Sequence, residues 1–134
     1  MDVDTAYPMP FALSAVRAVT VRVSREFGVS PERLFAAWLD PRIRERFLPI
    51  ACGSGAQVCY AEIDRPHRLT FEVRLGGDAR PHDHVTVELA PLERGALLVL
   101  IHETGVHRAP DRAGLKAAWT ASLVVLEAVL DHEL

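Results

Sequence analysis

The sequence predicts one α+β domain in which helices cover one face of an antiparallel sheet. Three observations lead to this fold class. A strand pattern near the start is followed by two helix-start signals, the middle of the chain alternates between apolar and polar residues, and residues 114–134 have helical periodicity. A chain of 134 residues is of single-domain size.

The first strand and two short helices are predicted between residues 19 and 49. Val19 to Phe27 alternates apolar and polar residues, which indicates a strand with one buried face. Ser30-Pro31 is typical of a helix start, because the serine oxygen caps free backbone N–H groups and proline suits the first helical position. Asp40-Pro41 repeats this signal and predicts a second helix that ends near Phe47, before Pro49.

A first hairpin is predicted from Val58 to Asp64 and from Arg68 to Leu75. Pairing Ile63 with Leu69 places Ala61 opposite Phe71 and Cys59 opposite Val73, on the buried face. The same pairing places Tyr60, Glu62, Thr70 and Glu72 on the outer face.

A second hairpin is predicted from His84 to Ala90 and from Ala96 to Glu103. Pairing Leu89 with Leu98 sets Val87 against Leu100 and Val85 against His102, all facing inward. His102 is therefore expected on the buried side of the last strand.

The final helix begins after Asp111, which we expect to cap it, and carries an apolar stripe with a single tryptophan, Trp119. Such a helix must lie against a broad apolar surface, and the sheet supplies one. Residues 1–18 are interpreted as an N-terminal arm and residues 19–134 as the folded domain.

Composition excludes several classes of protein. The apolar fraction is 49%, the charged fraction is 25% and the net charge is −3, without the clustered basic residues of a nucleic-acid-binding surface. No run of about 18 apolar residues predicts a membrane span, and we expect a cytoplasmic protein. The two cysteines, Cys52 and Cys59, are expected to be free thiols, with Cys59 a small core residue.

The candidate ligand site is a cavity between the sheet and the last helix. An apolar cavity with a few polar groups is the usual form of a small-molecule site. The alternative is that the same side chains simply fill the core. The ten candidates are those predicted to face inward: Trp38, Phe47, Phe71, Val73, Val85, Val87, Leu100, His102, Trp119 and Leu123.

His102 is the polar member of this set. It could hydrogen-bond a ligand or act as an acid or base, and the alternative is a core histidine bonded to a backbone carbonyl. A zinc site with His82, His84 or His107 is disfavoured, because His84 has the opposite phase to Val85 and hence to His102. No nucleophile, phosphate-loop or dinucleotide motif is present. We therefore name no catalytic residue, metal or cofactor.

Residues 96–101 are apolar at every position, which is unusual in a sheet with one solvated face. Leu97, Val99 and Ile101 would expose an apolar strip, and Ala121, Val124, Val125 and Ala128 lie outside the main stripe of the last helix. Exposed strips of this kind indicate a partner. We expect a homodimer through either surface; the alternative is that the N-terminal arm covers the strip.

Three segments resemble the activator of the heat-shock-protein-90 ATPase, in the START-like (SRPBCC, helix-grip) superfamily. The first segment, residues 29–41, is similar to the first helix of that family with its Asp-Pro stop. The second, residues 60–71, resembles its central hairpin, and the third, residues 118–126, resembles its C-terminal helix. The likeness covers residues ~19–132 and implies a helix-grip fold. The chain departs from the family between Pro49 and Gln57, where a further hairpin is missing, so a shortened sheet is expected.

The resemblance implies three functions. The first is a binding or carrier protein for a small hydrophobic molecule. The second is a cyclase- or hydratase-like enzyme with His102 as its acid or base, and the third is a chaperone-associated interaction module. Only one polar residue is predicted to face the cavity and no charged docking surface is evident, so ligand binding is the favoured prediction.

Overall fold

The computed structural model describes residues 19–74, 83–105 and 111–132. Predictions for the N-terminal arm, Leu75, His82 and His107 lie outside these residues. The described elements follow the predicted order, and their bounds are β1 (Thr20–Phe27), α2 (Pro31–Leu39), α3 (Pro41–Cys52), β2 (Gln57–Asp64), β3 (Arg68–Arg74), β4 (Asp83–Leu92), β5 (Gly95–Glu103) and α4 (Arg112–His132).

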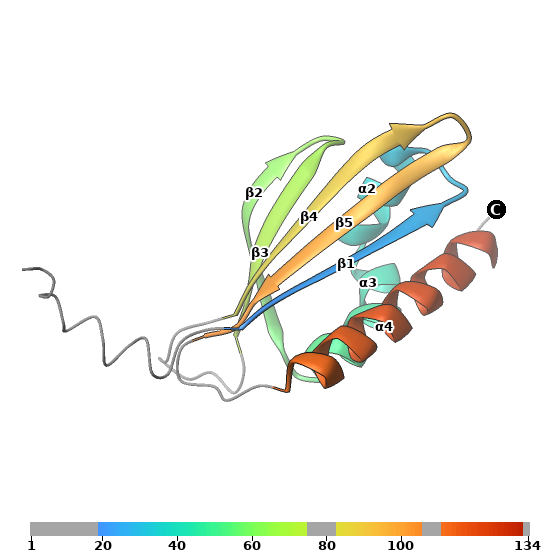
Figure 1. The fold of residues 1–134 in the computed structure, drawn as a ribbon. Helices are drawn as coiled ribbons and strands as arrows, with labels where there is room; N and C mark the ends of the chain where they lie inside the picture. The colour runs from blue at the N-terminus through green and yellow to red at the C-terminus, as the bar shows by residue number, and fades with distance from the viewer. Residues whose placement is uncertain (1–18, 75–82, 106–110, 133–134) are drawn as a thin grey trace, which may run out of the picture.

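The sheet has five antiparallel strands in the order β1-β5-β4-β3-β2. Figure 1 shows α2, α3 and α4 on one side of this curved sheet, with the long helix α4 running beside β1. The α+β class and the helix-grip arrangement are therefore confirmed. The apolar core lies between the sheet and the three helices.

The β4–β5 hairpin has the predicted register. Leu89 pairs with Leu98 and Val85 pairs with His102. Each of these four residues is at most 5% exposed, because the inward phase of both strands faces the helices. This register carries the polar side chain of His102 into the apolar layer.

The β2–β3 hairpin has the predicted pairing only at its turn end. Ile63 pairs with Leu69 as expected, but the register shifts between Tyr60 and Glu62, so Ala61 is an extra residue without a partner. Such a β-bulge reverses the faces of all residues beyond it. The predictions for Cys59, Tyr60 and Ala61 are therefore wrong.

The correction exchanges the environments of two neighbouring side chains. Tyr60, predicted to lie on the outer face, pairs with Phe71 and is half-buried against the core. Cys59, predicted to lie inward opposite Val73, pairs with Glu72 and is exposed. A bulge caused by one extra residue leaves no signal in the alternation of apolar residues, since Ala61 fits either face.

Helix α3 does not end near Phe47. It continues to Cys52 and contains Pro49, so the predicted stop is wrong. Proline removes only one helical hydrogen bond, and less than one turn follows it here. The helix ends instead at Gly53, whose positive φ of 88° suits glycine and whose N–H donates to Pro49 O at 2.8 Å.

Helix α4 is fixed to the rest of the domain by polar contacts as well as by its apolar stripe. Ser122 Oγ donates to Phe47 O at 2.6 Å, and the Arg25 guanidinium lies 2.6 Å from a Glu127 carboxylate oxygen. By length and composition α4 could cross a membrane. Its contacts with α3 and β1, however, are those of a core helix.

The outer face of β5 is less exposed than predicted, because Leu97, Val99 and Ile101 are half-buried. Their neighbours across the ladders include Glu26, Glu88 and Arg22, and long polar side chains of this kind can cover apolar surface with their alkyl stems. On α4, Val124 is 45% exposed. A homodimer through either surface stays a prediction.

Candidate ligand site between the sheet and helix α4

The ten candidate residues all lie in the layer between the sheet and the helices. Each is at most 3% exposed, which is consistent with both a ligand site and a filled core. Strands β3, β4 and β5 contribute Phe71, Val73, Val85, Val87, Leu100 and His102, and the helices contribute Trp38, Phe47, Trp119 and Leu123.

Four of these residues form an aromatic cluster around Trp38. The centroid of the Trp38 ring lies 4.9 Å from that of Phe47, in edge contact, and 6.0 Å from that of Phe71. The Trp119 ring lies 6.3 Å away. These spacings are typical of packed aromatic pairs, and they bring α2, α3, β3 and α4 together at one point.

The indole N–H of Trp38 has no acceptor among the described residues, although the nitrogen is buried. Trp38 itself is 0% exposed. Burying a donor without a partner costs about 1–3 kcal/mol, so such groups are rare in native proteins. The cluster therefore contains an unused hydrogen-bond donor in an apolar environment.

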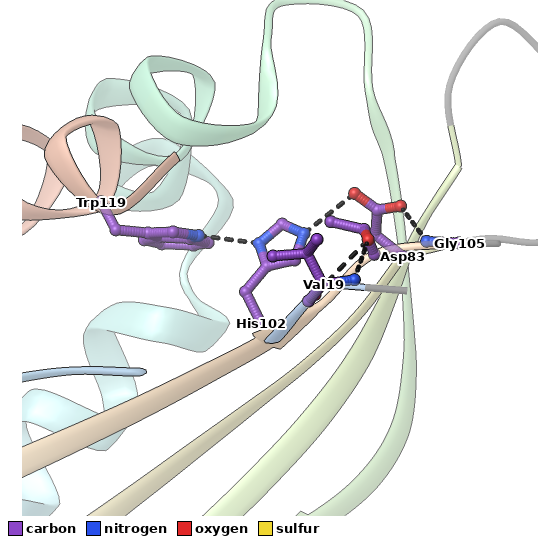
Figure 2. A network of polar contacts seen from close by, with 6 residues as sticks. Val19, Asp83, His102, Gly105 and Trp119 are labelled. Carbon is purple, nitrogen blue, oxygen red and sulfur yellow. Dashed lines mark hydrogen bonds and ion pairs between the residues drawn. The ribbon is translucent and has the colours of Figure 1, made fainter. Parts of the chain in front are cut away.

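A second polar feature crosses the same layer, from α4 to the start of β4 (Figure 2). Trp119 Nε1 donates to His102 Nδ1 at 2.8 Å, and His102 Nε2 lies 2.9 Å from Asp83 Oδ2. The three residues are at most 4% exposed. Their hydrogen bonds join α4, β5 and β4 inside the core.

The protonation of His102 follows from its partners. An indole nitrogen can only donate, so Nδ1 must be the acceptor, and the ring proton is on Nε2, which donates to the Asp83 carboxylate. Both ring nitrogens are thus engaged within the protein. His102 is neither bonded to a backbone carbonyl, as the core alternative assumed, nor free to exchange a proton with a ligand.

Asp83 was not identified from the sequence. Its second oxygen, Oδ1, accepts from Gly105 N at 2.9 Å, which fixes the chain beyond β5 to the start of β4. A signal for this residue was available, because Asp83 lies two positions before Val85 and so shares its inward phase. An inward acid on the strand paired with His102 is a candidate acceptor for a buried hydrogen bond from that histidine.

Tyr60 and Arg44 form a third polar group, which sequence reasoning also missed because of the bulge. Tyr60 OH donates to Trp38 O at 2.6 Å and accepts from Arg44 Nη1 at 2.6 Å. The Arg44 guanidinium carbon lies 5.5 Å from the Tyr60 ring centroid, in cation–π contact. Burial raises the pKa of Tyr60 above 10.0, and the positive charge of Arg44 partly opposes that shift.

Among the residues that the structure describes there is neither a candidate metal site nor a disulfide. No group of three His, Cys, Asp or Glu side chains there could hold a metal ion. Cys59 is a free thiol, and no disulfide joins it to Cys52. The polar chemistry of this layer is therefore that of hydrogen-bond donors and acceptors.

Comparisons with known structures find the same fold. Protein CV1439 from Chromobacterium violaceum is 25% identical and matches 82% of this chain and 96% of its own, with a TM-score of 0.67. MLL2253 from Mesorhizobium loti is 24% identical over 85% of this chain and 98% of its own, with a TM-score of 0.69. DynU16, a protein of the dynemicin biosynthetic locus, is 20% identical over 84% of this chain and 47% of its own, with a TM-score of 0.68.

A comparison with curated proteins gives no match. A family model does match: residues 50–131 fit the family described as activator of Hsp90 ATPase homolog 1-like protein. This range covers more than half of the chain and includes the central hairpin and α4, two of the segments that carry the resemblance. The chain belongs to the activator of Hsp90 ATPase homolog 1-like family, within the START-like (SRPBCC) superfamily.

Proposed function

We propose that the protein binds a small, largely apolar molecule that presents a hydrogen-bond acceptor to Trp38 Nε1, between the sheet and helix α4. The observation that carries this proposal is the buried indole N–H, for which residues 19–74, 83–105 and 111–132 supply no acceptor. A ligand carbonyl or ether oxygen in the aromatic cluster would satisfy it, and the apolar body of the ligand would contact Phe47 and Phe71. Membership of a superfamily with a ligand-binding type of fold supports the same function.

Entry of a ligand requires movement, because each of the ten candidate side chains is at most 3% exposed. The aromatic rings around Trp38 must separate to admit a molecule. Trp119 is held by His102, whereas the Trp38 indole has no such bond. Trp38 is therefore the ring we expect to move.

The hydrogen bonds of His102 do not support the alternative function, an enzyme in which this histidine is the acid or base. A general base needs a free nitrogen within reach of the substrate, and both nitrogens of His102 are hydrogen-bonded to Trp119 and Asp83. We therefore propose binding without a reaction.

The first experiment is native mass spectrometry of freshly purified protein, which would detect a co-purified molecule. The second compares 1-tetralone with tetralin, which has the same ring system without the carbonyl, by the fluorescence of Trp38 and Trp119. We expect the ketone to bind about two- to tenfold more tightly, as one hydrogen bond allows.

The matched variant is Trp38→Phe, which removes the N–H and keeps an aromatic ring. In this variant the preference for the ketone should disappear. Failure of both probes to bind at millimolar concentration, together with an empty native mass spectrum, would overturn the proposal. A preference that survives Trp38→Phe would overturn the role of the indole.

A further inference from the structure

A separate cleft lies on another part of the surface, between helix α3 and the start of strand β2. Its volume is about 290 Å³, near the lower end of the range for small-molecule sites. Neither Trp38 nor Trp119 lines it. Its lining includes Arg44, Glu45, Leu48, Pro49, Cys52 and Val58.

One side of the cleft is apolar. Leu48 is 5% exposed, and Val58 is half-buried against the core. Pro49, the proline within α3, lies beside them along the cleft. These side chains offer a surface for a short apolar chain, because burying apolar area there is favourable.

The cation in the cleft is held in one orientation. Arg44 Nη1 donates to Tyr60 OH at 2.6 Å, and the guanidinium lies over the Tyr60 ring. Tyr60 is fixed in turn by its bond to Trp38 O. A side chain that is already ordered loses less conformational entropy on binding a ligand.

No carboxylate in the described part of the chain neutralises the charge of Arg44. Among the described residues no carboxylate oxygen lies within 4.0 Å of its guanidinium, although Arg25, Arg42 and Arg68 all have such partners. A guanidinium has five N–H donors arranged to match a carboxylate. Glu45, the acid in the lining, is exposed and forms no ion pair with Arg44.

We propose that this cleft is a second binding site, for a small monocarboxylate with a short apolar chain. The carboxylate binds the guanidinium of Arg44, and the chain lies along Leu48, Pro49 and Val58. At about 30 Å³ for each water-sized group, a volume of about 290 Å³ holds about ten heavy atoms. Hexanoate, the probe we choose, is slightly smaller than this limit and therefore fits.

The test is a titration with sodium hexanoate, followed by the backbone amide signals in 15N–1H spectra. We expect shifts at residues 44–58. Hexanamide, which has the same chain without the charge, should bind more weakly. Arg44→Met keeps an unbranched apolar chain and should weaken hexanoate binding about two- to fivefold, which corresponds to the loss of one partly exposed ion pair.

The matched control is Arg42→Met on the same helix, since Arg42 does not line the cleft; its affinity for hexanoate should be unchanged. Glu45→Gln removes the only acid of the lining and should tighten binding. If Arg44→Met does not fold, the comparison of hexanoate with hexanamide on the native protein decides the question.

The proposal is overturned if hexanoate and hexanamide bind equally, if Arg44→Met and Arg42→Met behave alike, or if the shifts map outside residues 44–58. The two sites can fail independently. Trp38→Phe should change the binding of 1-tetralone and leave hexanoate unaffected, whereas Arg44→Met should do the reverse.

Discussion

Trp38 and Trp119 are both fully buried, and their rings lie 6.3 Å apart, yet within the described parts of the chain only Trp119 has an acceptor for its indole N–H. The two residues thus form a natural pair for measuring what a buried indole hydrogen bond contributes. They are also the only tryptophans in the chain. Substitutions at the two positions therefore test the buried Trp38 N–H and the Trp119–His102 hydrogen bond separately.

We predict that Trp119→Phe lowers the free energy of unfolding by about 1–3 kcal/mol more than Trp38→Phe. Both changes remove the same atoms from the core, but only the first leaves a buried acceptor, His102 Nδ1, without its donor. Urea denaturation of the two variants measures the difference. Equal losses would mean that the Trp119–His102 bond adds nothing to stability.

Asp83→Asn should lower the free energy of unfolding by about 1–3 kcal/mol. The carboxylate accepts from both His102 Nε2 and Gly105 N, whereas an amide has one oxygen and presents N–H groups to the other donor. Denaturant unfolding with Asp64→Asn as an exposed control would check this. A loss no larger than that of the control would contradict the proposed buried network.

Stability should fall with rising pH above about pH 10 because of Tyr60. Burial raises its pKa in the folded protein, so between the unfolded and the folded pKa the unfolded chain binds fewer protons. The free energy of unfolding then decreases as pH rises, and its decrease ends once the folded pKa is passed.

Tyr60→Phe is the control for this effect, since the ring stays and the ionisable group is lost. The difference between wild type and variant should be constant below pH 9 and should shrink from about pH 10 upward. Denaturant unfolding at a series of pH values measures it. A difference independent of pH across this range would contradict a raised pKa.

We predict a homodimer at micromolar concentration, measured by light scattering. Val99→Lys would place a charge in the half-buried strip of β5, and Val124→Lys would place one on the exposed face of α4. The variant that gives a monomer identifies the surface. A monomeric mass for the wild-type protein would contradict the prediction.

The fold could be predicted because its signals are local and repeated. The Ser30-Pro31 and Asp40-Pro41 starts match the observed caps, in which Ser30 Oγ accepts from Arg33 N and Asp40 Oδ1 accepts from Arg42 N. The β4–β5 register followed from alternation alone. Such features depend on residues that are neighbours in sequence or across one turn.

The candidate site could be predicted only in part. The sequence indicates that His102 faces inward, but its partner Trp119 lies on α4 and its partner Asp83 at the start of β4. Periodicity within single elements does not specify that these three side chains meet. Tyr60 was assigned to the wrong face, because an extra residue at Ala61 has no signature in side-chain type. As a result, the polar group that orients Arg44 could not be foreseen.

The bulge at Ala61 also determines how the β2 strand tolerates changes in length. Residues on both sides of it already pair in register, Tyr60 with Phe71 and Glu62 with Thr70. Loss of the single codon for Ala61 would therefore join two correctly phased halves into a regular ladder. Loss of a codon for one of residues 57–60 would instead move the residues between the start of β2 and the deletion to the opposite face of the sheet. Ala61 is therefore the one position in this strand at which a deletion keeps every other side chain beside its present neighbours.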